Sequence, residues 1–81
     1  MKITLKLFSV YRDITGSKQM TIDVAPGTTL VDLLGRLLNS YPALKPLAES
    51  VVLAVNRDFA DSETSLKEGD EVALMPPIGG G

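Results

Sequence analysis

The residues with the most distinctive chemistry are the last six, Pro76-Pro77-Ile78-Gly79-Gly80-Gly81. Proline fixes φ and lacks an N–H group, so the proline pair ends any preceding strand and keeps the chain extended. The three glycines have no Cβ atom, which makes this segment narrow and frees its backbone. The four residues from 78 to 81 reach roughly 13 Å when extended. This pattern predicts a tail, residues 76–81, that carries the α-carboxylate of Gly81 into a narrow partner site, with Gly80 giving clearance.

A run of glycines at the end of a sequence also has a simpler interpretation, because such ends are often frayed and without function. In either case we expect Gly79, Gly80 and Gly81 to be mobile in the free protein, since they have no side chains to pack. The rest of the chain must decide between the two interpretations.

Other chemistry is restricted by composition, because the 81 residues include no Cys, His or Trp. This excludes thiolate nucleophiles, Ser–His and Cys–His pairs, and zinc sites with Cys or His ligands. No acid–base pair or phosphate-binding loop can be assigned either, so we expect no metal site and no catalysis by this chain alone. The α-carboxylate of Gly81 is the one group left for chemistry.

Charge and hydropathy limit the partners. A formal net charge of −2 argues against nucleic acid as the main partner. No apolar run approaches the eighteen residues that span a bilayer, and the amino-terminal residues do not read as a signal peptide, so we expect a cytoplasmic protein without a membrane partner. Acidic residues concentrate in the second half of the chain, where they either steer a basic partner or simply keep a small domain soluble. They are Asp58, Asp61, Glu63, Glu68, Asp70 and Glu71.

The elements before the tail begin with a predicted β-hairpin. Residues 2–10 alternate between polar and apolar types, which predicts a half-buried strand. Its inward residues are Ile3, Leu5 and Leu7. Phe8 and Val10 fall on the opposite face, which should meet water. Residues 11–16 predict a short helical turn that ends at a glycine, and residues 18–24 predict the second strand.

One long helix follows. Thr29 offers an N-cap, and Asp32 three residues later completes a pattern similar to a capping box. The apolar residues of the helix repeat at the spacing of one helical face, and Pro42 stops the pattern. They are Leu30, Leu33, Leu34, Leu37, Leu38 and Tyr41. We assign this stripe to the core rather than to a cofactor site.

The remainder predicts an irregular or short helical connection over residues 43–50, a third strand over 51–55, and a turn toward Phe59. Leu66 is expected to plug the core under a loop. The last strand covers residues 71–75, with Val72 and Leu74 inward and Ala73 and Met75 outward. A hairpin, one helix and further strands predict an α+β fold of the β-grasp, or ubiquitin-like, type over residues 1–75. Its small mixed sheet has one main helix on one face and leaves the other face open.

The open face is a candidate partner surface. Phe8 and Met75 lie out of phase with the inward residues of their strands, and the first and last strands of a β-grasp sheet lie side by side. Both side chains should therefore lie near the point where the tail leaves, and Phe59 extends the patch unless it folds inward. Isolated exposed apolar residues are ordinary, but a cluster beside a functional tail favours an interface.

The C-terminal stretch Leu66-Lys-Glu-Gly-Asp-Glu-Val-Ala-Leu-Met-Pro-Pro-Ile-Gly-Gly-Gly81 resembles that of the small subunit of molybdopterin synthase. That family ends in a Gly-Asp-Glu-Val strand, a Pro-Pro pair and Gly-Gly. Residues 8–13, the helix entry over 29–34, and Val55-Asn56 are also similar, so the resemblance covers essentially the whole chain. Gly79 is a departure, because the family more often has Ser or Thr there, and it should loosen the tail.

The resemblance implies a sulfur carrier. In that family, a ubiquitin-activating-like adenylyltransferase uses ATP to adenylate the terminal glycine, and sulfide from a persulfide donor displaces AMP. The thiocarboxylate then enters the large subunit, with which the small subunit forms a heterotetramer, and gives sulfur to cyclic pyranopterin monophosphate. For this chain the resemblance assigns Gly81 and Gly80 to that chemistry, and no cofactor to the chain itself. It assigns partner contacts to Phe8, Phe59, Met75, Pro76, Pro77, Ile78 and Gly79.

Three alternatives remain at this point. Gly81 of a ubiquitin-like modifier is joined to lysines of other proteins, and thiamin-type sulfur carriers share the Gly-Gly end but are usually shorter and lack Pro-Pro. A plain interaction domain would use neither Gly81 nor its carboxylate.

Overall fold

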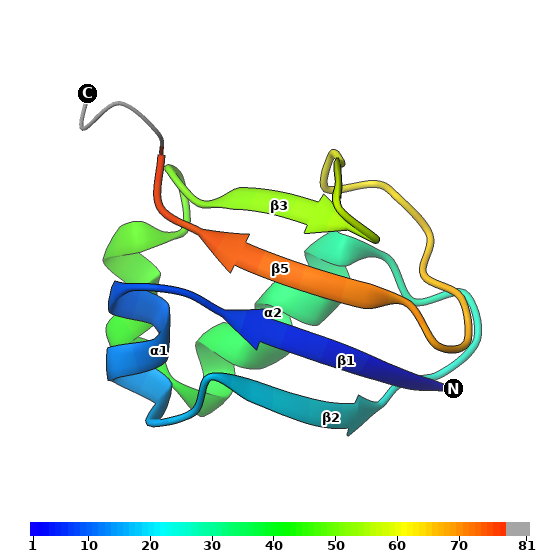
Figure 1. The fold of residues 1–81 in the computed structure, drawn as a ribbon, viewed down its shortest axis with the longest axis horizontal. Coiled ribbons are helices and arrows are strands. Elements are labelled where there is room, and N and C mark those ends of the chain that lie inside the picture. The colour runs from blue at the N-terminus through cyan, green and yellow to red at the C-terminus, as the bar shows by residue number, and fades with distance from the viewer. Residues whose placement is uncertain (78–81) are drawn as a thin grey trace.

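A five-stranded mixed sheet runs through the molecule, and helix α2 (Leu30–Ser40) crosses one of its faces (Figure 1). The computed structural model describes residues 1–77. Its strands are β1 (Lys2–Leu7), β2 (Gln19–Asp23), β3 (Val52–Val55), β4 (Asp58–Phe59) and β5 (Glu71–Met75). Its helices are α1 (Val10–Thr15), α2 (Leu30–Ser40) and the 3-10 helix η1 (Pro42–Leu47). The expected α+β, β-grasp architecture is confirmed.

The strand order is β2-β1-β5-β3-β4, so β5 lies between the first and third strands. β1 and β5 pair in parallel, with Thr4 opposite Glu71 and Leu7 opposite Leu74. The remaining neighbours are antiparallel. The last strand therefore sits in the middle of the sheet and delivers the chain to one end of it.

Helix α2 is fixed at its start by the predicted capping box. The Asp32 backbone N–H donates to the Thr29 hydroxyl at 3.3 Å, and the Thr29 backbone N–H donates to the Asp32 carboxylate at 3.1 Å. These two bonds satisfy N–H groups that the first helical turn leaves unpaired. At the other end, Pro42 begins η1 directly after the C-cap residue Tyr41.

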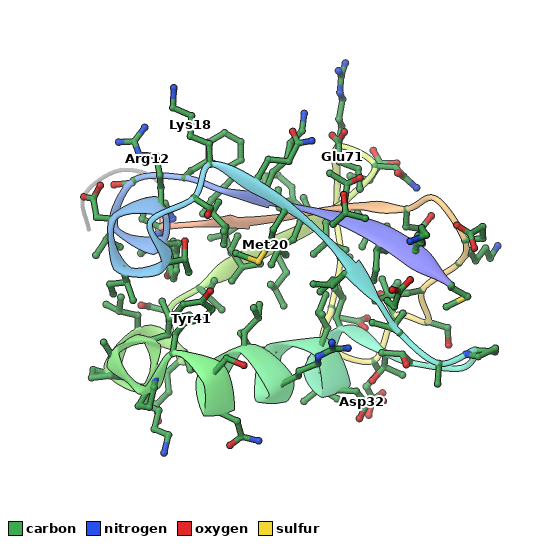
Figure 2. The ribbon with its side chains drawn as sticks, turned by 90° about the horizontal axis from the view of Figure 1, so that it is seen from below. Arg12, Lys18, Met20, Asp32, Tyr41 and Glu71 are labelled. Carbon is green, nitrogen blue, oxygen red and sulfur yellow. The ribbon has the colours of Figure 1, made fainter. Side chains whose placement is uncertain are left out.

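The core fills the space between α2 and the sheet. Leu66 is buried as predicted, although it belongs to no helix or strand. The cluster of buried side chains consists of Ile3, Leu5, Leu7, Tyr11, Val24, Leu30, Leu33, Leu37, Leu44, Leu66, Val72 and Leu74. Figure 2 shows Met20 of β2 pointing toward α2, and this side chain packs against the cluster.

The predicted first strand over residues 2–10 is too long, because β1 ends at Leu7. The Phe8 backbone N–H still donates to the Leu74 carbonyl at 3.3 Å, but Ser9 takes a φ of 53° and turns the chain into α1. Val10 therefore begins a helix and packs partly buried against the core, so its expected position on the solvent face is wrong. Phe8 does remain exposed.

The β3–β4 hairpin closes through Asn56 and Arg57, whose φ values are 52° and 73°. Two central residues with positive φ are typical of the two-residue turns whose twist suits adjacent strands. β4 was not predicted as a strand; Phe59 pairs with Ala54, which places both side chains on one face of the sheet.

Asp70 has a structural role that the sequence did not reveal. Its carboxylate accepts hydrogen bonds from the Asn56 side-chain amide at 2.9 Å and from the Lys67 backbone N–H at 2.8 Å. The Asn56 side-chain oxygen in turn accepts the Glu71 backbone N–H at 3.0 Å. Asp70 is buried, so its expected role as a steering charge is wrong. It ties the hairpin turn to the start of β5.

Candidate functional site

The open face of the sheet carries two rows of side chains that run across the strands. One row joins Lys6, Ala73, Ala54 and Phe59, which are successive partners in the register of β1, β5, β3 and β4. Met75 and Val52 form the next row. Phe8, the first residue after β1, lies beside this row, because its backbone N–H donates to the carbonyl of Leu74. Because side chains alternate along a strand, all of these lie on the face opposite to α2.

These rows border a depression that we term the apolar hollow, with a volume of about 340 Å³. Its apolar lining consists of Phe8, Ala54, Phe59, Ala73 and Met75. Two alanines on adjacent strands keep the floor low, while larger side chains stand around it. Phe8 is 45% exposed and Phe59 is 74% exposed, so the open question about Phe59 is resolved in favour of the surface. The structure thus brings together all three residues of the predicted patch.

Polar groups border the apolar hollow at Lys6, Arg57 and Glu71. The Lys6 ammonium lies 3.3 Å from the Glu71 carboxylate, an ion pair that links β1 to β5. Because both side chains are partly exposed, this pair contributes little to stability. Arg57 comes from the β3–β4 turn and has no counterpart in the sequence-based site, because its position depends on a two-residue strand that alternation does not predict.

The tail begins at the edge of this surface. β5 ends at Met75, and the next two residues, the half-buried Pro76 and the exposed Pro77, belong to no helix or strand. β5 points toward the end of the sheet where α1 lies (Figure 1). The expected roles of Ile78, Gly79, Gly80 and Gly81 lie outside the described residues and stay predictions.

A second depression, which we term the basic hollow, adjoins the first and shares Lys6 and Phe8 with it. Arg12 of α1 and Lys18, just before β2, add two further cations to its lining. Figure 2 shows Arg12 and Lys18 on the side of the sheet away from α2, the side on which Glu71 also lies. Among residues 1–77, no acidic side chain lines the basic hollow, although Arg12 lies 3.7 Å from Asp13 beside it. Sequence reasoning missed this cluster because its three cations are spread over residues 6–18.

The described residues offer little further chemistry. Within residues 1–77 there is no group of three metal-ligating side chains that could hold an ion. No helix in the same range combines the length and the apolar character needed to cross a membrane. Burial raises the pKa of the Tyr11 phenol above its ordinary value, and this side chain belongs to the core. The open face can therefore bind a partner, but within the described range it presents no reactive group.

Comparison with known proteins agrees with this arrangement. The sequence profile of the ThiS family matches residues 5–81. The chain belongs to the ThiS family. The match covers all but the first four residues, which confirms the relationship that the C-terminal motif indicated.

Among curated members, the molybdopterin synthase sulfur carrier subunit of Chlamydomonas reinhardtii is 32% identical to this ThiS-family chain, and the alignment covers all of both chains. The crystal structure of SAMP1, small archaeal modifier protein 1, from Haloferax volcanii superposes over all of both chains with a TM-score of 0.85 at 28% identity. A chain in the complex of subunits 1 and 2 of molybdopterin-converting factor from Helicobacter pylori gives 0.70 at 27% identity, again over both whole chains.

Proposed function

We propose that this ThiS-family chain is the sulfur carrier subunit of a molybdopterin synthase, with Gly81 as the residue that carries the sulfur. One structural observation supports this most directly. The apolar hollow lies beside the start of the tail, so a protein that covers the hollow can receive the tail at the same time. The likeness to sulfur carrier subunits over the full length of both chains points to the same function.

The chemistry follows from the weakness of a carboxylate as an electrophile. A ubiquitin-activating-like adenylyltransferase uses ATP to convert the Gly81 carboxylate into an acyl adenylate. The terminal sulfur of a persulfide donor displaces AMP to form an acyl disulfide, and a thiol then reduces this disulfide, which releases the thiocarboxylate and leaves a disulfide between the donor and the thiol. The resulting thiocarboxylate is delivered to the large subunit, where sulfur passes to cyclic pyranopterin monophosphate. In this proposal the large subunit supplies the catalytic side chains, and the present chain supplies the sulfur and its placement.

The apolar hollow gives the proposal a docking surface. Phe8, Phe59 and Met75 come from three different parts of the chain, and the sheet register brings them around one floor of two alanines. Such a surface, with an apolar interior and charges at its margin, resembles the general anatomy of a protein interface. The structural relative from Helicobacter pylori is described in complex with a second subunit, which supports a partner of this kind.

Deletion of Gly81 tests the proposal. The deletion leaves a carboxylate on Gly80, about 3.5 Å short of the reacting position. Since misplacement by about 1 Å can cost on the order of a hundredfold in rate, sulfur transfer should be nearly lost. The assay combines thiocarboxylated chain, large subunit and pterin precursor. Gly80→Val, which keeps the length but adds a branched side chain, should also be impaired.

Binding to the large subunit is the matched readout. Both variants should still bind, because the apolar hollow is unchanged. Full sulfur transfer by the chain that lacks Gly81 would contradict the mechanism. Loss of transfer together with complete loss of binding would show instead that the tail serves mainly as an anchor.

A second function is favoured by the close structural match to small archaeal modifier protein 1. In that case the Gly81 carboxylate would form an isopeptide bond with a lysine of another protein. Mass spectrometry of the chain from its native host separates the two functions. A thiocarboxylate, in which sulfur replaces one oxygen, supports the carrier, whereas branched peptides joined through Gly81 support the modifier.

A further inference from the structure

Arg57 occupies a backbone position that suits glycine better than arginine. The β3–β4 turn consists of Asn56 and Arg57, and both have positive φ. Turns of this type most often contain Asn-Gly, since asparagine tolerates positive φ and glycine has no Cβ to clash. An arginine at a φ of 73° is therefore strained.

The fold gains from the first turn residue but not visibly from the second. The Asn56 side chain bonds to both the Asp70 carboxylate and the Glu71 backbone N–H. In contrast, the ion pairs within residues 1–77 involve the cations of Lys2, Lys6 and Arg12, and none involves Arg57. The Arg57 side chain is exposed. Its strain is not offset by an ion pair inside the domain.

The side chain does line the apolar hollow, beside Phe59 and Ala54. The other two charged groups at this margin, Lys6 and Glu71, already form an ion pair with each other at 3.3 Å. Arg57 is thus the charge at the margin without an ion-pair partner among the described residues. A partner that covers the hollow would bring its own polar groups to this guanidinium.

We propose that Arg57 is a partner-contact residue whose guanidinium binds a carboxylate on the protein that covers the apolar hollow. The inference rests on the proposed function, which supplies the large subunit as that protein. A guanidinium presents a planar fork of donors that matches a carboxylate in two parallel hydrogen bonds. An apolar cover lowers the local dielectric and strengthens such a pair. We assign the acceptor to a protein rather than to a nucleic acid for two reasons. The surface beside Arg57 is apolar, and the net charge of −2 on the chain argues against binding to nucleic acid.

This role predicts opposite changes in stability and in affinity. Arg57→Gly relieves the strain at positive φ, so the thermal midpoint should rise by about 4 °C relative to the wild type. The same variant loses the guanidinium, so affinity for the large subunit should fall by about tenfold. A residue that serves the fold would lower the midpoint when replaced, and a residue without a role would leave affinity unchanged.

The experiment measures the dissociation constant by titration calorimetry with the full chain and the large subunit, and the midpoint by circular dichroism. Arg57→Gln keeps the backbone strain but removes the charge, so it should bind about tenfold more weakly without the gain in stability. Lys45→Gln removes one positive charge from η1, at a position that lines neither hollow, and should bind as the wild type does. Phe8→Ala reports on the apolar hollow itself.

If either Arg57 variant binds the large subunit as tightly as the wild type does, the inference is overturned. If Arg57→Gly does not fold, the affinity of Arg57→Gln alone decides the test. An equal loss in Lys45→Gln would also overturn it, because the effect would then be general electrostatic attraction. If Phe8→Ala weakens binding while Arg57→Gln does not, the apolar hollow is the docking surface but the proposed Arg57–carboxylate contact is wrong. If the wild-type chain does not bind the large subunit at all, the proposed function fails and takes this inference with it.

Discussion

The two faces of the sheet are both apolar at their centre, yet they differ in their exposure to solvent. On the face beneath α2, Leu5, Val72 and Leu74 are excluded from solvent. On the open face, Phe8 and Phe59 remain exposed around a floor of small residues. Strand alternation thus assigns each apolar side chain of the sheet either to the core, where it stabilises the domain, or to the open face, where the proposed function uses it to bind a partner.

β5 shows this division within five residues. Val72 and Leu74 point into the core, whereas Ala73 and Met75 point to the open face. Neighbours on the strand are therefore matched probes of folding and of binding, because they share the backbone and differ in the face they occupy.

The largest expected effect on stability belongs to the inner face. Leu74→Ala should reduce the free energy of unfolding by about 3 kcal/mol, because it removes a fully buried side chain and leaves a cavity. Urea unfolding monitored by circular dichroism measures this loss. Met75→Ala is the control, and its loss should stay below about 1 kcal/mol because that side chain is only partly buried. Equal losses in the two variants would show that the two faces do not differ in this way.

Affinity for the large subunit should depend on the open face rather than on the inner face. Phe8→Ala and Met75→Ala should each weaken binding to the large subunit by about 2 kcal/mol, the typical cost of truncating a central anchor. Their folds should remain intact in the same buffer. Val31→Ala is the matched control, since Val31 is also an exposed apolar residue but lies on α2. If both open-face variants bind as tightly as the wild type, the apolar hollow is not the docking surface.

A smaller effect is expected at the start of α2. Thr29→Ala removes half of the capping box and should cost about 1 kcal/mol of stability, with no change in affinity for the large subunit. Thr29→Ser retains the hydroxyl and should restore most of the loss. Thermal unfolding and calorimetric binding on the same three proteins make the comparison. Weaker binding by Thr29→Ala would mean that the two faces are coupled.

The smallest effect concerns Tyr11 and alkaline pH. Burial raises the pKa of its phenol, so the folded state holds this proton more tightly than the unfolded state does. The resulting stability is complete below the unfolded pKa of about 10 and is lost as the pH rises above it. Thermal midpoints between pH 8 and pH 11 should therefore fall less steeply for Tyr11→Phe than for the wild type. If the thermal midpoints of the two proteins fall in parallel with pH, the raised pKa of Tyr11 is contradicted.

The sequence predicted the parts of this structure that depend on periodicity and local chemistry. Alternation along the strands assigned Val72 and Met75 to opposite faces, and the spacing of Thr29 and Asp32 predicted the capping box. These signals act over a few residues, so they are visible without knowledge of the fold. The predicted patch of three apolar residues followed from them once the first and last strands were paired.

The features that the sequence did not predict depend on turns without a clear sequence signal or on contacts between distant residues. β1 ends at Leu7 because Ser9 turns the chain, and nothing in the alternation of residues 2–10 indicates that turn. The burial of Asp70 depends on Asn56, fourteen residues earlier. Arg57 reaches the hollow only because two-residue β4 folds back on β3, and strands this short leave no periodic signal.

The central position of β5 has a mechanical consequence. Under the proposed function, a partner that draws the tail into its site would pull β5 along its axis, between the parallel neighbour β1 and the antiparallel neighbour β3. Force in that direction loads the hydrogen bonds of both ladders together, whereas force across a strand would break them one at a time. A pull on the end of β5 would therefore be resisted by the hydrogen bonds to both of its neighbouring strands together.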